Sequence, residues 1–477
     1  MDPLLQMSAL ELAQHIRLQT LSAVTVVSRH IEHISKTNPY LNALVVDRFA
    51  RARQEALLAD TLVAEATASH TLHLLPPLLG VPCTIKESIA VNGFPNTAGS
   101  IHRKNLLADT DAPTVKKLKE AGAIILGVTN TSELCMWMES FNPVYGLTNN
   151  AYSEAHTAGG SSGGEGAIVG SGASPFGLGS DIGGSIRMPA LFNGIFGHKG
   201  SPGLISNAGQ YPQPDGIAQE MLATGPLCRR AEDLPLLLGI LTGQPERFKS
   251  AASISIHQLR IIRRRPVLKP TADRAQETAI EQATQLLQEA GARVEYHDWP
   301  EFADAFTLWS NLLSSANSTS FAEMMYGSNS LVSAGKALGQ LITQPEPPHT
   351  LPLILLSMLE RLPGLFTQRR NHWVRKCELL RQKLTDILQD DGIILDLAYP
   401  TQAPKHYRAM LPPWGFTYAA IYNALRLPAT QIPMGIRSGL PTGIQAIASP
   451  DNDQLGIAVA LYLEERTGGW TPPWMVG

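Results

Sequence analysis

The chain has 477 residues, of which 44% are hydrophobic and 17% are charged. Since one hydrophobic core usually serves no more than roughly 250–300 residues, the length is compatible with two domains or with one large α/β domain carrying an added helical layer. The 38 basic and 41 acidic side chains leave a formal net charge of −3, which argues against a nucleic-acid partner or an anionic membrane bound through bulk charge.

The cysteines and the first residues of the chain bear on its compartment. The four cysteines lie far apart and form no CxxC pair: Cys83, Cys135, Cys228 and Cys377. This pattern favours neither a zinc site nor a disulfide framework, and it indicates a reducing compartment. The first twenty residues carry scattered charges and no long apolar run, so we expect no signal peptide or membrane anchor and a cytoplasmic location.

Helices are predicted over residues 1–70, because the segments 9–16, 23–34 and 47–60 place apolar residues at spacings of three and four. Residues 71–240 differ from this helical segment. The run 123–128 (AIILGV) predicts a buried strand, and glycine becomes dense further along.

Glycine makes up fifteen of the forty-five residues 159–203. The average glycine content of proteins is about 7%, and the absence of a Gly-X-Y period excludes collagen. Glycines this dense permit tight turns and close approach of one backbone to another.

The second half of the chain returns to an α/β pattern. Residues 259–264 predict a strand, and the following stretch to 297 predicts a helix, a stop at Gly291 and a further strand. Residues 301–390 are predicted to be rich in helix, with two short helices in the Pro-broken apolar stretch 351–366. Short strands are predicted again over 392–446, so we expect one sheet that both halves of the chain supply.

Three segments carry candidate chemistry: GVPCTIKES with Lys86, TAGGSSGGEGA with Ser161 and Ser162, and GLGSDIGGSIRMPA with Ser185. A serine needs a base to act as a nucleophile, and a lysine can be that base if burial lowers its pKa. Two glycines directly before Ser185 allow several backbone N–H groups to face one hollow, as an oxyanion requires. A helix beginning at Ser185 would add its positive end.

Two other kinds of site use segments similar to these. A phosphate-binding loop fits poorly, because GLGSDIG is one residue too long for GxGxxG and no P-loop motif is present. GGSSG matches the GxSxG nucleophile motif, with Ser161 as the nucleophile, but no clear strand–turn–helix with a downstream histidine follows it. Lys86 taken alone would be read as a surface residue, and only its pairing with the two Gly-Ser segments favours a functional role.

The run 159–197 resembles the signature sequence of the amidase signature family, and the segment of Lys86 is similar to the lysine motif of that family. Further similar segments are TNTSELCMW (129–137), TGPLCRRAEDL (224–234), APKH (403–406) and GLPTGIQ (439–445), so the resemblance covers nearly the whole chain. Within the family, SELCMWMES and NGIFGHK look most similar to fatty-acid amide hydrolases, especially the second vertebrate type. Those enzymes often begin with a membrane-spanning helix, and we expect no such helix from the first residues of this sequence.

The resemblance implies the amidase signature fold, an α/β fold with a mixed central β-sheet surrounded by α-helices. It implies one amidase domain over 1–477, with a helical segment at 1–70, the signature core at 71–240 and a helical insert at 301–390 that caps a substrate channel. It also implies catalysis by Lys86, Ser161 and Ser185, with Ser185 as nucleophile, Lys86 as base and Ser161 between them after a cis peptide bond.

The resemblance assigns further residues as well. The oxyanion hole would consist of the amides of Ile182, Gly183, Gly184 and Ser185. Ser162, Asp181 and Arg187 would orient the triad. Cys135, Met136 and Met138 would line the acyl-binding channel, although ordinary core packing is an equally good explanation for any one of them.

The expected reaction is hydrolysis of an amide with an apolar or fatty acyl group, with esterase or urethanase side activity and no metal or cofactor. The expected partner is that small-molecule substrate, with no nucleic acid. Weak peripheral contact with a membrane through 351–366 and a homodimer are further expectations. The alternative is the amidase subunit of a tRNA-dependent amidotransferase complex, against which the apolar segments 132–138 and 351–366 argue.

Overall fold

A computed structural model describes residues 2–314, 319–326, 331–359, 367–411 and 413–476. Its centre is an 11-stranded sheet with the strand order β1-β3-β2-β6-β8-β7-β12-β13-β11-β9-β10. The strands from β1 to β8 come from the first half of the chain, and those from β9 to β13 come from the second half. The predicted fold class, a mixed sheet surrounded by helices and supplied by both halves, is confirmed.

The strands of this sheet are β1 (Leu44–Asp47), β2 (Pro82–Lys86), β3 (Ile124–Thr129), β6 (Phe176–Asp181), β7 (Phe196–Lys199), β8 (Ala223–Cys228), β9 (Arg260–Arg264), β10 (Arg293–His297), β11 (Gly392–Asp396), β12 (Ala429–Arg437) and β13 (Leu440–Ile447). A separate two-stranded sheet pairs β4 (Phe141–Asn142) with β5 (Gly146–Leu147). The strands predicted at 123–128 and 259–264 are confirmed as β3 and β9. β1 was not predicted, because its four residues lie between two strongly helical segments.

The helices are α1 (Ala9–Arg17), α2 (Ala23–Leu41), α3 (Phe49–Ala68), α4 (Pro113–Glu120), α5 (Gly163–Gly170), α6 (Arg187–Phe192), α7 (Gly216–Met221), α8 (Asp233–Thr242), α9 (Pro245–Lys249), α10 (Arg274–Glu289), α11 (Ala305–Ser314), α12 (Phe321–Tyr326), α13 (Leu331–Thr343), α14 (Leu351–Leu359), α16 (Thr367–Leu388), α17 (Thr417–Ala424) and α18 (Asp453–Thr467). The predicted helices of the N-terminal segment are confirmed as α1 to α3. Ser8 begins α1 through a capping box with Glu11, which satisfies backbone groups that a helix end leaves unpaired.

Two parallel strands at the centre of the sheet place the candidate residues together. β2 pairs with β6 in parallel, with Thr84 opposite Gly177, so both strands end at the same edge of the sheet. Lys86 is the last residue of β2 and Asp181 is the last residue of β6. Side chains 95 residues apart in the sequence (86 to 181) therefore lie near one another at this edge.

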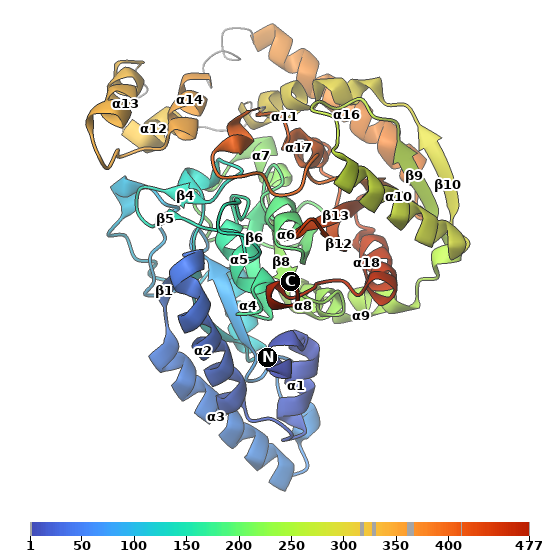
Figure 1. Ribbon diagram of the computed structural model, residues 1–477. Helices are drawn as coiled ribbons and strands as arrows, with labels where there is room; N and C mark the ends of the chain where they lie inside the picture. Colours follow the sequence, from blue (N-terminus) through green and yellow to red (C-terminus); the bar gives the residue numbers. More distant parts are fainter. Residues whose placement is uncertain (1, 315–318, 327–330, 360–366, 412, 477) are drawn as a thin grey trace.

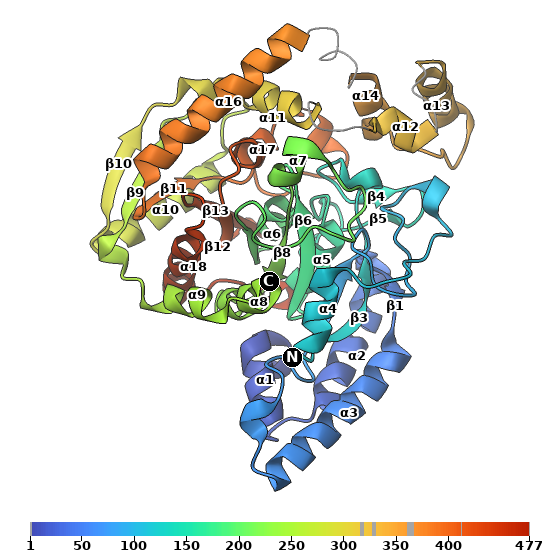
Figure 2. The same cartoon turned by 180° about the vertical axis from the view of Figure 1, so that it is seen from behind.

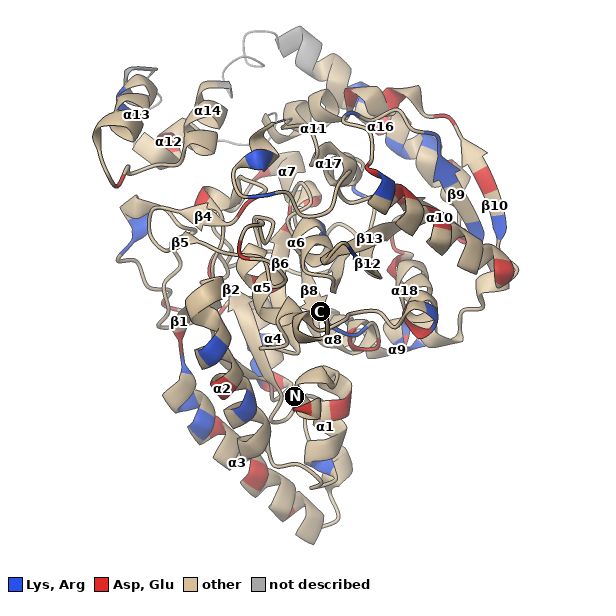
Figure 3. Cartoon of the chain, viewed as in Figure 1, with Lys and Arg blue, Asp and Glu red and all other residues tan. Residues whose placement is uncertain are grey.

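Helices cover the sheet and extend beyond it at two ends (Figures 1 and 2). In both views α2 and α3 lie at one end, and α12, α13 and α14 form a group at the other. Figure 3 shows few charged residues on α12 to α14, whereas α2, α3 and the edge formed by β9, β10 and α10 carry many. No helix in the described part of the chain is both long enough and apolar enough to cross a membrane.

The helix-rich character predicted for 301–390 is confirmed by α11 to α16. The first of the two short helices predicted in 351–366 corresponds to α14. Residues 360–366, where the second was predicted, lie outside the described residues.

Candidate active site

Lys86 lies at the centre of the site, and its side chain is fully buried. Its Nζ lies 2.6 Å from Oγ of Ser161 and 3.0 Å from Oγ of Ser180. Burial lowers the pKa of Lys86 below its ordinary value, and the nearby Cys135 and Asp181 oppose this shift only in part. A lysine in this state is poised to exchange protons with a hydroxyl.

Ser161 follows Gly160 through a cis peptide bond, as the resemblance implied. The loop is tightly surrounded, because a Cβ at Gly160 would lie 2.5 Å from the carbonyl oxygen of Trp137. Oγ of Ser140 donates to the carbonyl oxygen of Ser161 at 3.0 Å. These contacts fix the Ser161 hydroxyl beside Lys86.

Ser162 connects the two Gly-Ser segments. Its amide donates to the carbonyl oxygen of Ser185 at 3.2 Å, and its hydroxyl donates to the carbonyl oxygen of Ser180 at 3.2 Å. Ser161 and Ser185 line the same cavity, and Ser185 is 7% exposed. Ser185 lies two residues before α6, which begins at Arg187, so the prediction that Ser185 begins this helix is wrong.

The four amides assigned to an oxyanion hole do not share one environment. The amide of Gly184 donates to Oδ1 of Asp181 at 2.7 Å and therefore already has an acceptor. Among the described residues, none accepts a hydrogen bond from the backbone amides of Ile182, Gly183 or Ser185. Gly184 adopts a φ of 111°, and a Cβ there would lie 2.7 Å from that of Ala419. Glycine is therefore required at this turn.

Asp181 and Arg187 form a fully buried ion pair, with Arg187 Nε 3.0 Å from Asp181 Oδ2. Burial by itself would raise the pKa of Asp181, but the guanidinium charge and its hydrogen bonds outweigh burial and hold the pKa well below its usual range. Arg187 also donates to Gln445 Oε1 at 2.8 Å, and Asn423 Nδ2 donates to Asp181 Oδ1 at 2.9 Å. The turn from Asp181 to Arg187 is therefore held by residues from the second half of the chain.

Several residues of the site were not predicted from the sequence. The hydroxyl of Ser180 accepts a hydrogen bond from Lys86. Ser180 stands directly before Asp181, within the candidate segment GLGSDIGGSIRMPA. Trp309 of α11 donates from Nε1 to the carbonyl oxygen of Ile182 at 2.8 Å and packs beside Gly183. Gln445 lies in the segment GLPTGIQ, which resembles the amidase signature family. Trp309 and Asn423 lie outside the segments that carry this resemblance.

Glu165 is a second buried carboxyl group near Lys86. Its two oxygens accept from Thr84 and Thr129, each at 2.7 Å. Burial raises the pKa of Glu165 to about 8, although these hydrogen bonds and Lys86 oppose the shift. Burial therefore favours the uncharged form of this carboxyl group.

The cavity at Ser185 has two lobes that share Cys135, Met136, Ile182 and Ser185. The larger lobe has a volume of about 260 Å³. Its lining is mainly apolar and includes Met138, Trp309, Leu355, Leu356, Trp414 and Phe416. The predicted channel residues Cys135, Met136 and Met138 all line this lobe.

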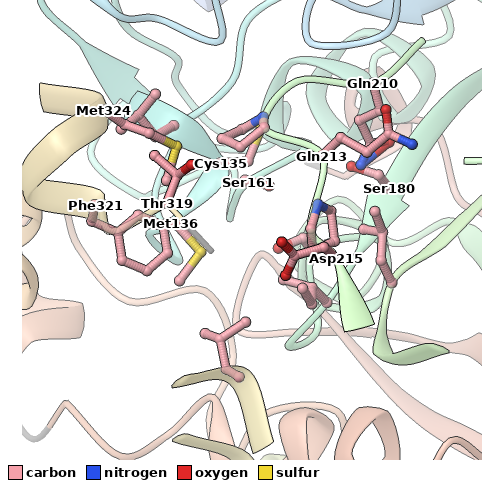
Figure 4. Close-up of a pocket in the computed structure, with 17 residues that line it drawn as sticks. Cys135, Met136, Ser161, Ser180, Gln210, Gln213, Asp215, Thr319, Phe321 and Met324 are labelled. Atoms are coloured by element: carbon pink, nitrogen blue, oxygen red, sulfur yellow. The ribbon is translucent and has the colours of Figure 1, made fainter. Parts of the chain in front are cut away.

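The smaller lobe has a volume of about 80 Å³ and a mixed lining. Figure 4 shows Gln210, Gln213 and Asp215 on one side of it and Phe321 and Met324 on the other. A molecule cut at Ser185 could therefore place an apolar part in one lobe and a hydrogen-bonding part in the other.

The chain is similar to known proteins over nearly its whole length. Residues 25–455 match the model of the family described as Amidase. The chain is 40% identical to fatty-acid amide hydrolase 2-B of Danio rerio, covering 100% of this chain and 92% of that protein. It is 39% identical to fatty-acid amide hydrolase 2 of Homo sapiens, covering 99% and 91%.

A solved structure described as fatty acid amide hydrolase superposes with a TM-score of 0.78 at 21% identity, covering 98% of this chain and 86% of that one, which supports the fold. The chain belongs to the amidase signature family. It is accordingly an amide-hydrolysing enzyme.

The ion pair of Asp181 and Arg187 gives a stability prediction. Arg187→Met leaves the Asp181 carboxylate buried and unpaired, so we expect the free energy of unfolding at pH 7 to fall by about 3–5 kcal/mol. Because the pKa of Asp181 is lowered in the folded state, the stability from this pair is present above the ordinary carboxyl pKa of about 4 and is lost as the pH falls below it. Urea titrations at pH 7 and at low pH measure both effects.

The matched control is the double variant Asp181→Leu/Arg187→Met, which removes both charges. It should lose less stability than the two single variants together. Additive losses would show that the two side chains act separately.

Proposed function

We propose that the chain hydrolyses carboxylic amides through an acyl-enzyme on Ser185, with Ser161 passing a proton between Ser185 and Lys86. The observation that carries this proposal is the 2.6 Å contact between the buried Lys86 Nζ and Ser161 Oγ, beside a cavity that Ser161 and Ser185 share. The lowered pKa of Lys86 supports it, because only the neutral amine can accept a proton.

In the acylation step, neutral Lys86 takes the proton of Ser161 while Ser161 takes that of Ser185. The Ser185 oxygen attacks the amide carbon, and the carbonyl oxygen becomes an oxyanion. The amides of Ile182, Gly183 and Ser185 would receive it, whereas the Gly184 amide holds the turn through Asp181. Lys86 then returns the proton through Ser161 to the leaving nitrogen as the C–N bond breaks.

Deacylation repeats these proton transfers with water in place of Ser185. Water adds to the acyl carbon as its proton passes to Lys86. The proton then returns to the Ser185 oxygen as the ester bond breaks. The enzyme is restored and a carboxylic acid is released.

The two lobes suggest how a substrate would lie. The acyl group would occupy the larger lobe, whose methionine, leucine and tryptophan side chains suit an apolar or fatty chain. The amine would face Gln210 and Gln213 in the smaller lobe, where a polar leaving group finds hydrogen-bonding side chains. Esters and urethanes of the same shape are expected as additional substrates.

The alternative is the amidase subunit of a tRNA-dependent amidotransferase. Such a subunit needs a glutamine pocket and partner chains, and a lobe lined by Trp309, Trp414 and Phe416 suits a small polar substrate poorly. Rapid hydrolysis of a chromogenic fatty anilide by the purified chain alone would favour the amidase.

The nucleophile is tested by Ser185→Ala, with Ser161→Ala as its matched variant. Turnover of an acyl anilide should fall at least about a thousandfold in Ser185→Ala, because no covalent intermediate can form. Labelling by a fluorophosphonate probe should be lost in the same variant. Labelling that survives in Ser185→Ala and disappears in Ser161→Ala would show that the two roles are reversed.

The role of Lys86 is tested by the pH dependence of kcat. Since catalysis needs the neutral amine, the rate should rise with pH and level off above the pKa of Lys86, which lies below the ordinary value of about 10.4. Lys86→Ala should be crippled and should lose this ascending limb. A Lys86→Ala variant with the normal rate and the normal profile would contradict the proposed triad.

Apolar substrates suggest weak, reversible membrane contact at the larger lobe. Met358 of α14 and the strongly exposed Leu411 (77%) lie near residues that line this lobe, such as Leu355 and Met410. Met358→Asp/Leu411→Asp should weaken partitioning onto liposomes about a hundredfold or more, because insertion of each native side chain contributes about 1.5–3 kcal/mol. Turnover of a short soluble anilide should not change.

The matched control for flotation is Leu58→Asp/Leu62→Asp, which changes two exposed leucines on α3 at the other end of the molecule. Equal losses of flotation in the two double variants would show that the rim of the larger lobe has no special part in membrane contact.

A further inference from the structure

Glu133 directly precedes Leu134 and Cys135, which line the cavity, and its carboxylate joins another part of the chain. Its Oε1 lies 2.7 Å from Nδ1 of His349, and its Oε2 accepts from the backbone amide of Thr350 at 2.7 Å. The Glu133 and His349 side chains are 1% and 4% exposed. Both carboxylate oxygens therefore have a partner away from solvent.

Thr350 stands directly before α14, and its carbonyl oxygen accepts from the amide of Ile354 at 3.1 Å. The Glu133 carboxylate thus lies at the N-terminus of this helix, where a negative charge is favourable. Leu355 and Leu356 of the same helix line the larger lobe. The position of Glu133 relative to the start of α14 therefore affects one wall of that lobe.

A second part of the lining follows directly after Glu133. Leu134 and Cys135 follow it with φ angles of 49° and 57°, a conformation that residues with a Cβ rarely adopt. Two such residues in succession persist only where the surroundings hold them. Cys135 and Met136 line both lobes directly after this turn. The Glu133 carboxylate therefore connects two of the segments that line the apolar lobe, the one that follows Glu133 and α14.

Few other polar contacts join the helices around His349 to the rest of the described chain. Among described residues 319–326 and 331–358, the contact of His349 with Glu133 is the one ion pair that reaches outside this segment. The His349 ring packs edge to face on Tyr326 of α12, with ring centroids 5.2 Å apart, and lies 5.6 Å from that of His102. Figure 1 shows α12, α13 and α14 as a group set apart from α11 and α16.

We propose that Glu133 is a positioning residue that, through His349 and Thr350, fastens the α12–α14 group to the cavity wall and thereby sets which acyl lengths the enzyme accepts. This inference rests on the proposed function, in which the larger lobe receives the acyl chain. Loosening the contact would let α14 move relative to Cys135 and Met136. Long chains, which reach α14, would then be held less well than short ones.

The first test is Glu133→Gln, which keeps the size of the side chain and removes its charge. For a dodecanoyl anilide we expect kcat/KM to fall about tenfold, mainly through KM, whereas for an acetyl anilide it should stay within about twofold. The matched control is Glu346→Gln, the same change at an exposed position three residues before His349. Equal losses on both anilides, or equal effects of the two variants, would overturn the proposal.

The second test separates this contact from a general structural role. His349→Leu removes the donor and should reproduce the loss, whereas His349→Asn places an N–H near the position of Nδ1 and should restore selectivity. The double variant Glu133→Gln/His349→Leu should be no worse than the more affected single variant, since both changes remove one contact. Additive losses in the double variant would contradict the proposal.

A third measurement does not depend on catalysis. Hydrogen–deuterium exchange of the full-length protein should be faster over 351–359 in Glu133→Gln and unchanged over α2, with Glu346→Gln matching the wild type. If the wild type hydrolyses neither anilide, the proposed function fails, and exchange over 351–359 still decides whether Glu133 fastens α14. Unchanged exchange in Glu133→Gln would overturn the proposal.

Discussion

A lysine amine enclosed in the protein is the constraint on which the rest of the site depends. An ammonium group is poorly tolerated in such surroundings unless a carboxylate pairs with it, and the two nearby carboxyl groups do not serve that purpose. Asp181 is ionised, but Arg187 neutralises its charge. Glu165 is driven toward its uncharged form by burial. Neither carboxyl group forms an ion pair with Lys86, and burial favours the neutral amine beside Ser161.

The second constraint is that the loops of the candidate site belong to the first half of the chain, whereas residues of the second half hold them in place through hydrogen bonds. Lys86 ends β2, Ser161 lies just before α5 and Ser185 follows β6, all in the first half of the chain. Trp309 covers the turn at Ile182, and Gln445 holds Arg187 from β13. The central sheet makes this arrangement possible, because β7 of the first half pairs directly with β12 of the second.

The sequence predicted most of the fold and several of the residues that the structure brings together at the candidate site. Helical periodicity identified α1 to α3 and α10, and short apolar runs identified β3 and β9, because these signals are local. Lys86, Ser161 and Ser185 were found from motifs. Trp309, Asn423 and His349 could not be found, since each bonds a residue of the site that lies more than a hundred positions away in the sequence. The occupied amide of Gly184 depends on the exact path of a turn, which glycine content alone does not reveal.

The separation of Arg187 and Gln445 in the sequence also sets a delay during synthesis of the chain. These residues are 258 positions apart, and ribosomes add about 5–20 residues per second, so Gln445 is made on the order of 10–50 s after Arg187. During that interval the guanidinium lacks one of its acceptors, and the catalytic loops lack the strand and helices that later cover them. The support of Arg187 can therefore be completed only after Gln445 has been made, and until then the loops of the site remain without the residues that later hold them.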